Sequence, residues 1–241
     1  MPRAPRNSVG GVVYHALNRA AGRRRIFRTP GDYAAFVACV AEAAAAVPGC
    51  RVLAWCVMPN HWHLVLWPRR DGELSAFVRR LTQTHARRHR SARNAVGDGP
   101  LYQGRYKSFP AEQDEHFLML CRYVERSALR AGLCRRAADW QWGSARARSR
   151  GPADLRALLS EWPVDRPRHW VDLLNEPQPA DQEQRVETSL ARGRPLGDAN
   201  WVTRTAARLG LTHTLRPPGR PRKQPVAERP KRGRNPKRGR I

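Results

Sequence analysis

Two short apolar runs joined by a turn constrain the fold of this chain more than any other segment. Arg51 to Val57 and His61 to Trp67 are rich in Val and Trp, and Met58-Pro59-Asn60 lies between them. Apolar runs of this length, bounded by a Pro-Asn turn, are typical of strands, and their proximity predicts a β-hairpin. The hairpin defines the middle of the fold, and the neighbouring segments decide its class.

The segments around the hairpin switch between strand and helix patterns, read from the spacing of their apolar residues. The predicted strands are Val9 to Leu17 and Leu101 to Phe109, and the predicted helices are Asp32 to Val47, Glu73 to Arg93 and Gln113 to Arg130. The order strand, helix, strand, strand, helix, strand, helix predicts an α/β (α+β) chain of ferredoxin-like type. We expect an antiparallel sheet with helices mainly on one face, the other face being partly free for a ligand.

The C-terminal part of the chain has weaker patterns. Only Ala153 to Leu159 and Trp201 to Leu209 are predicted helices there, so residues 147–215 are expected to form a helical and irregular extension of a main domain at 8–146. From residue 216 onward, Lys, Arg, Pro and Gly are frequent, and the single acidic residue is Glu228. Residues 216–241 are therefore predicted to be a basic tail that does not fold by itself.

The charge of the chain indicates a polyanionic partner. Lys and Arg number 45 against 20 Asp and Glu, a formal net charge of +25. Nucleic acid is favoured over a membrane, because no stretch approaches the roughly 20 apolar residues of a spanning helix. Arg far outnumbers Lys and Ala is abundant, so an alternative is that part of the Arg excess reflects a GC-rich gene.

The cysteines and the N-terminus indicate the compartment. Five cysteines are present without a C-x-x-C pair, and several lie in apolar segments, which predicts buried free thiols in a reducing environment. The first residues are basic and lack the apolar core of a secretory signal. We expect a cytoplasmic, nucleoid-associated protein.

His61 and His63 lie two residues apart at the start of the second hairpin strand. Residues two apart in a strand point to the same face, so the two imidazoles project side by side while Trp62 points the other way. Two imidazoles so placed can hold one metal ion. By spacing alone, two polar rings on a half-exposed sheet face are the commoner interpretation.

Tyr123 lies beside the apolar arc of the predicted helix at Gln113 to Arg130. Helical spacing places His116, Ser127 and Arg130 along the same edge. A tyrosine at such a boundary usually packs its ring against the core and keeps its hydroxyl in water, which is the alternative to a chemical role.

Several motifs occur together and in a fixed order. They are Tyr14-His15-Ala16-Leu17-Asn18-Arg19, Met58-Pro59-Asn60-His61-Trp62-His63-Leu64-Val65, Tyr102-Gln103-Gly104-Arg105-Tyr106-Lys107-Ser108, Arg122-Tyr123-Val124-Glu125-Arg126-Ser127-Ala128-Leu129-Arg130-Ala131-Gly132-Leu133 and Trp140-Gln141-Trp142-Gly143-Ser144. This ordered set resembles the single-tyrosine HUH transposases, particularly the REP-associated tyrosine transposases, over roughly residues 8–146.

The resemblance implies a chemistry and a set of roles. His61 and His63 would hold a divalent metal, Mg or Mn, and Tyr123 would attack a scissile phosphate of single-stranded DNA, leaving a 5′-phosphotyrosine link and a free 3′-hydroxyl. The family has Asn or Gln as a further ligand one turn after the tyrosine. Ser127 stands at that place here, so it is the implied third ligand.

The predicted DNA contacts are cations of the main domain and of the tail. In the main domain they are Arg19, Arg105, Lys107 and Arg130. In the tail, Pro218 to Lys223 resembles an AT-hook, with Arg220, Arg222 and Lys223 as its cations, and a nonspecific electrostatic arm is the alternative.

Other functions and assemblies stay open from the sequence. One is a catalytically weak or inactive, domesticated transposase that only binds DNA, which the serine at 127 favours. Another is an RNA-binding module, which would need exposed stacking residues such as Trp55, Trp62 and Trp67. The relatives implied by the resemblance act as monomers or as homodimers, so the partners expected are single-stranded or hairpin DNA and, in one alternative, a second copy of the chain.

Overall fold

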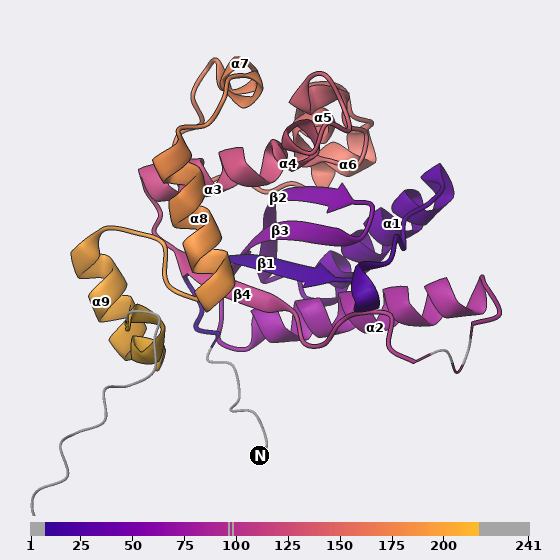
Figure 1. Cartoon of the computed structure of the whole chain (residues 1–241), viewed down its shortest axis with the longest axis horizontal. Coiled ribbons are helices and arrows are strands. Elements are labelled where there is room, and N and C mark those ends of the chain that lie inside the picture. Colours follow the sequence, from indigo (N-terminus) through magenta and orange to yellow (C-terminus); the bar gives the residue numbers. More distant parts are fainter. Residues whose placement is uncertain (1–7, 96, 98, 217–241) are drawn as a thin grey trace, which may run out of the picture.

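The sheet is the centre of the fold. The computed structural model describes residues 8–95, 97 and 99–216. Their four strands form one antiparallel sheet with the order β2-β3-β1-β4 (Figure 1). The strands are β1 (Val13–Arg19), β2 (Cys50–Met58), β3 (His61–Pro68) and β4 (Lys107–Ala111). The predicted hairpin is β2 and β3, and the ferredoxin-like α+β class is confirmed.

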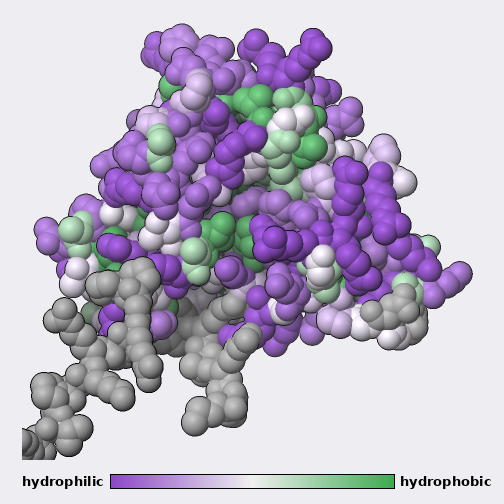
Figure 2. Space-filling view, viewed as in Figure 1, coloured by the Kyte–Doolittle hydropathy of each residue, from purple (hydrophilic) through white to green (hydrophobic). Residues whose placement is uncertain are grey.

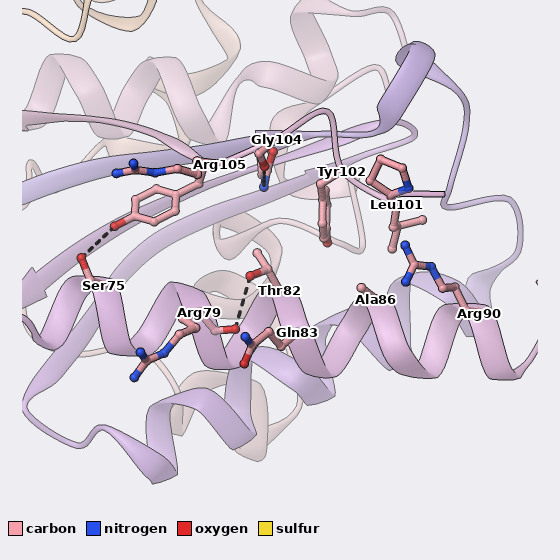
Figure 3. A pocket seen from close by; sticks show the side chains of 13 residues that line it. Ser75, Arg79, Thr82, Gln83, Ala86, Arg90, Leu101, Tyr102, Gly104 and Arg105 are labelled. Carbon is pink, nitrogen blue, oxygen red and sulfur yellow. Dashed lines mark hydrogen bonds between the residues drawn. The ribbon is translucent and has the colours of Figure 1, made fainter. Parts of the chain in front are cut away.

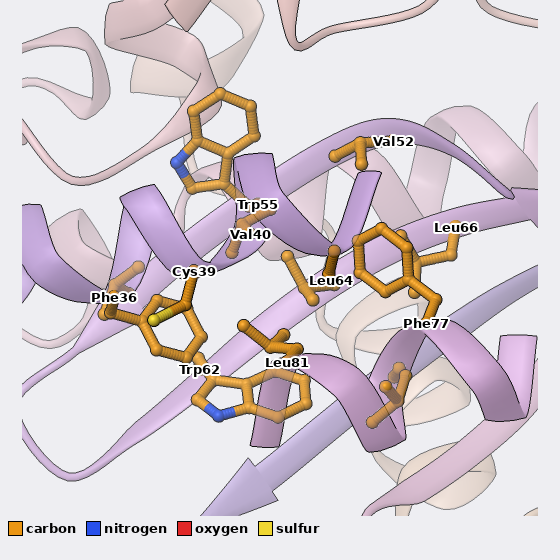
Figure 4. Close-up of a cluster of buried hydrophobic side chains, with 14 of the residues drawn as sticks. Phe36, Cys39, Val40, Val52, Trp55, Trp62, Leu64, Leu66, Phe77 and Leu81 are labelled. Atoms are coloured by element: carbon orange, nitrogen blue, oxygen red, sulfur yellow. The ribbon is translucent and has the colours of Figure 1, made fainter. Parts of the chain in front are cut away.

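Two long helices, α1 (Pro30–Ala46) and α2 (Glu73–Ser91), cover one face of the sheet. The start of α1 is fixed by a capping box in which Thr29 and Asp32 each accept a backbone N–H, with Pro30 in the first turn. The core between these helices and the sheet includes large, fully buried side chains (Figure 4), among them Phe36, Trp62, Leu64, Phe77 and Leu81.

The opposite face carries α3 (Glu115–Glu125) and the short α4 (Ser127–Arg130). A single helix was expected from 113 to 130; instead it begins after the N-cap Asp114 and is interrupted at Arg126. A second apolar core lies here, between α3 and side chains such as Val65 and Phe109. The face expected to be partly free for a ligand is thus partly occupied by the helix that carries Tyr123.

The extension is built from short helices. These are α5 (Ser144–Arg150), α6 (Ala153–Ala157), α7 (Trp170–Asn175), α8 (Ala180–Arg192) and α9 (Ala199–Arg208), with a 3-10 turn at Thr212–Leu215. Two further 3-10 turns, at Ala21–Arg23 and Ala137–Asp139, lie before the extension. The sequence patterns did not predict α7 and α8. Trp170, Leu174, Val186 and Leu196 are buried in the second core, so the extension packs against the sheet face that carries α3.

The predicted strand from Leu101 to Phe109 was wrong over its first half. The strand begins only at Lys107. Leu101 and Tyr102 are both buried, which breaks the alternation of a strand, and Gly104 has φ +155°, which side chains rarely adopt. Residues 101–106 instead run along the sheet edge, where Tyr102 bridges to Ala20.

Four cysteines are buried and all five are free thiols, as predicted from their apolar surroundings. No helix among residues 8–95 and 99–216 is long and apolar enough to cross a membrane.

Candidate active site

The two histidines of the hairpin point to the face that carries α3. The His61 and His63 ring centroids lie 5.0 Å apart, with the ring planes at 75°. Strand β1 lies alongside, so that Arg19 pairs with His61 and Leu17 pairs with His63. The prediction that both imidazoles share one face is confirmed.

Trp62 points to the opposite face, where it is fully buried. Its indole N–H donates to the Tyr102 hydroxyl at 3.2 Å, and that hydroxyl lies 2.7 Å from Nδ1 of His85. Because the Tyr102 oxygen accepts from Trp62, its own proton is available to His85.

The three tryptophans do not form a stacking platform for RNA bases. Trp55 and Trp62 are buried in the first core, and the partly exposed Trp67 is covered by the Arg51 guanidinium, 3.4 Å from the ring centroid. The structure therefore argues against the RNA-binding alternative.

Burial keeps the two imidazoles neutral. Burial, with the charges of Arg19 and Arg130, lowers the pKa of His61 to about 4. Burial also holds the pKa of His63 well below its usual range, and neighbouring His61 adds to this effect. Neutral imidazole is the form that binds a metal ion, so the electrostatics of the site suit that role.

Each histidine uses only its Nδ1 within the protein. Nδ1 of His61 lies 2.6 Å from Oδ1 of Asn60, and Nδ1 of His63 lies 2.9 Å from Nε2 of His15. No hydrogen bond formed by the described residues involves Nε2 of either ring. Two neutral Nε2 atoms on one sheet face are a donor set that fits a divalent cation.

His15 was not among the site residues predicted from the sequence. It stands in an otherwise apolar stretch of the first strand, and this was the available signal. Its pairing with His63 depends on how β1 and β3 align, which the sequence alone does not reveal.

Tyr123 reaches the same site from α3. Its ring centroid lies 6.1 Å from that of His63, with the ring planes at 78°. The tyrosine is only 4% exposed, and the Arg130 guanidinium carbon stacks 4.0 Å from its ring centroid. Arg130 also lies within 4.0 Å of Glu183 and Glu187 on α8, so the extension helps to hold the cation over the tyrosine.

Ser127 is buried one turn after Tyr123, and its hydroxyl donates to the Tyr123 carbonyl at 3.0 Å. The expected edge of Tyr123, Ser127 and Arg130 is thus present. His116 does not join it, because its ring lies between Asp114, at 2.9 Å, and Arg185.

A second group of possible metal ligands lies at the start of α3. One ligand atom each from Glu112, Asp114 and His116 falls within a 4.8 Å group. These atoms already have protein partners: Glu112 accepts from the Asp198 N–H, and His116 contacts Asp114. The His61 and His63 pair, beside Tyr123, is the stronger candidate.

Predicted DNA contacts gather beside the site. Arg19, Arg105 and Lys107 line one hollow together with Arg23 and Leu190 of α8. A second hollow lies between α2 and residues 100–106 (Figure 3), and it shares Asn18, Gly104 and Arg105 with the first. Hydrophilic residues dominate the face shown in Figure 2. The tail cations Arg220, Arg222 and Lys223 lie outside the described residues.

Comparisons with known proteins identify a family model and a protein of similar fold. Over residues 8–127 the chain matches the family model described as transposase IS200 like. A solved REP-associated tyrosine transposase bound to a REP hairpin has a TM-score of 0.50 and 19% sequence identity, covering 68% of this chain and 94% of that one. A candidate transposase from Deinococcus radiodurans R1 has a TM-score of 0.37 and 22% identity, covering 52% of this chain and 96% of that one. No curated protein matches.

The matched segment contains the sheet, both histidines and the tyrosine, and it ends at Ser127. The site geometry and the family match therefore lead to one identification: the chain belongs to the IS200-like transposase family.

Proposed function

We propose that this chain nicks and rejoins single-stranded DNA, with Tyr123 as the nucleophile and His61 and His63 as ligands of Mg²⁺ or Mn²⁺. The observation that carries the proposal is the 6.1 Å separation of the Tyr123 and His63 rings on one sheet face. A phosphate bound beside the imidazoles is then within reach of the phenol.

The reaction conserves a phosphoester. The Tyr123 oxygen attacks phosphorus, the bond from phosphorus to the 3′ oxygen breaks, the phenol loses its proton and the 3′ oxygen gains one. A 5′-phosphotyrosine link and a free 3′-hydroxyl result. Since one phosphoester replaces another, the 3′-hydroxyl of a second strand can reverse the step, so nicking and strand transfer use the same chemistry without ATP.

A phenol with a reference pKa near 10 is a poor nucleophile at neutral pH. A divalent cation held by the imidazoles supplies the Lewis acidity that stabilises charge on the phosphate. Ser127 is proposed as a third ligand through its oxygen lone pairs, since its proton is donated to the Tyr123 carbonyl. A neutral hydroxyl is a weak ligand, so we expect modest affinity for the cation.

Arg19, Arg105 and Lys107 are proposed to hold phosphates of the strand that enters the hollow beside the site. A solved protein similar in fold binds a REP hairpin, which supports hairpin or repeat DNA as the substrate. Because both halves of the site belong to one chain, a homodimer is not required for the chemistry.

The test is formation of a covalent adduct. Purified full-length protein with Mn²⁺ or Mg²⁺ should nick single-stranded hairpin oligonucleotides and shift on a denaturing gel as a protein–DNA conjugate. Tyr123→Phe should fold equally and give no conjugate. No conjugate from the wild-type chain on any hairpin substrate that it binds would refute the activity.

A catalytically silent DNA-binding protein is the second candidate. Ser127 favours it, because the hydroxyl is engaged with the Tyr123 carbonyl and replaces the stronger ligand that the resemblance implies. Ser127→Asn separates the two functions. If the natural chain is inert and the variant forms the conjugate with Mn²⁺, the natural chain acts by binding alone.

A further inference from the structure

A third histidine lies beside His63, one of the candidate metal ligands. His15, in the middle of β1, is fully buried. Its Nε2 lies 2.9 Å from Nδ1 of His63, and its ring centroid lies 5.1 Å from that of His63 and 4.9 Å from that of Phe109. His15 therefore contacts a candidate ligand from the neighbouring strand of the same sheet face.

This position is unfavourable for an imidazole. The His15 side chain has no access to solvent, and its Nδ1 has no hydrogen-bond partner among the residues that the structure describes. A buried polar atom without a partner destabilises a fold, whereas an apolar residue of similar size would pack beside Phe109 without that loss. The stability of the sheet does not explain His15, so a role in the site is the better explanation.

The hydrogen bond between the two rings restricts where the protons lie. When Nε2 of His63 is a ligand, its ring proton is on Nδ1 and is donated to Nε2 of His15. The proton of neutral His15 is then on Nδ1, the atom without a partner. One arrangement of protons therefore leaves Nε2 of His63 free for a cation and places the His15 proton on the atom that has no partner.

We propose that His15 is a positioning residue: it fixes the orientation and tautomer of His63, so that His63 presents Nε2 to the divalent cation. The inference rests on the proposed function for the identity of the cation, but the ring contact that it uses is independent of Tyr123. The second ring nitrogen of a metal-binding histidine commonly donates to a carboxylate, a carbonyl or a water, and here a neutral imidazole takes that place.

The first test needs no variant. Ring ¹H–¹⁵N correlation spectra of the metal-free, full-length protein should show the His63 proton on Nδ1 rather than on Nε2, where free imidazole prefers to carry it. His15→Leu, if folded, should remove this preference. A His63 proton found on Nε2 in the wild-type chain would overturn the proposal.

The second test measures the cation directly, by Mn²⁺ titration followed by electron paramagnetic resonance. His15→Leu should weaken Mn²⁺ binding about 10- to 100-fold. His15→Gln should restore most of the affinity, because its amide oxygen can accept the His63 proton. The matched control is His85→Gln, at a buried histidine of α2 on the other sheet face, which should leave Mn²⁺ affinity unchanged. Unaltered Mn²⁺ affinity in folded His15→Leu would also refute the role.

Failure of the proposed function gives a different pattern. If the wild-type chain binds no Mn²⁺, the nicking proposal loses its cation, and the His63 tautomer still decides whether His15 fixes that ring. If Mn²⁺ binds normally and no DNA conjugate forms, both tests of His15 proceed unchanged.

Discussion

Tyr123 and His63 face each other within a single chain, their ring centroids 6.1 Å apart. The proposed nucleophile and the candidate ligand therefore come from α3 and β3 of the same molecule. A mixture of Tyr123→Phe and His63→Ala chains, each defective in one half of the site, should form no DNA conjugate. The measurement is a denaturing gel after co-refolding, with wild-type chains treated in the same way as the control.

Formation of the DNA conjugate by the mixture would contradict this prediction. Exchange of helices between two copies would build one intact site per mixed dimer, and conjugate would then reach a substantial fraction of the wild-type amount. That recovery would show that the site is completed by a second copy.

Salt dependence should reveal the cations that hold phosphates. Arg105 and Lys107 line the hollow beside the site. Removing one cation that binds a phosphate of single-stranded DNA lowers the slope of log affinity against log salt by about 0.7. Arg105→Ala and Lys107→Ala should each do so and weaken binding equally for unrelated sequences. Arg87→Ala, an exposed charge on α2, is the control and should change the slope much less.

A buried carboxylate links α3, the helix that carries Tyr123, to the extension. Glu125 is 2% exposed; it accepts from the Trp170 indole at 2.7 Å and from the Ser144 hydroxyl at 2.5 Å. Burial raises the pKa of Glu125, and these two bonds oppose that rise. Trp170→Phe should lower the free energy of unfolding by roughly 1–3 kcal/mol, because the buried acceptor loses a donor. Urea denaturation measures the change.

The control for Trp170 is Trp162→Phe. The Trp162 indole donates at 2.9 Å to the carbonyl of Leu53, a neutral acceptor. We expect a smaller loss, roughly 0.5–1.5 kcal/mol. Equal losses would mean that the carboxylate has no special part in holding α3.

Stability should fall in acid through His85. Burial, aided by neighbouring His89, lowers the pKa of His85 from 6.5 to about 3. Between these values the unfolded chain binds a proton and the native chain does not, so the contribution is complete above pH 6.5 and is lost as the pH falls towards 3. His85 should account for about 2 kcal/mol of lost stability between pH 6.5 and 4.5.

The comparison uses urea unfolding of the wild type and His85→Gln at both pH values. The glutamine can still accept from Tyr102 but does not titrate. Because His15, His61 and His63 titrate in both chains, their effects cancel in the difference. A pH dependence that is the same in the two proteins would contradict the low pKa.

Local patterns predicted much of the fold and part of the site. The two-residue spacing of His61 and His63 was sufficient to place both rings on one face, because alternation is a property of the strand itself. Helical spacing likewise placed Ser127 and Arg130 beside Tyr123. The catalytic, metal-binding and DNA-binding roles of these residues remain predictions.

Contacts between segments distant in the chain could not be predicted from local sequence patterns. The pairing of His15 with His63 depends on the register of β1 against β3. The short helices α7 and α8 are stabilised where Leu174 and Val186 enter the second core, so their own periodicity gives little signal. Residues 101–106 failed as a strand because tertiary burial of Leu101 and Tyr102 outweighed the alternating pattern.

The buried position of Trp62 helps to fix the register of β3, and with it the face on which His61 and His63 lie. A slip of β3 by one residue would exchange its two faces, moving the indole out of the first core, under α1 and α2, and both imidazoles into it. Such a slip would also break the hydrogen bond from Trp62 to Tyr102. Misregistered chains are therefore penalised by the core on the far side of the sheet. Burial of Trp62 on one sheet face thus selects the register that places both histidines on the other.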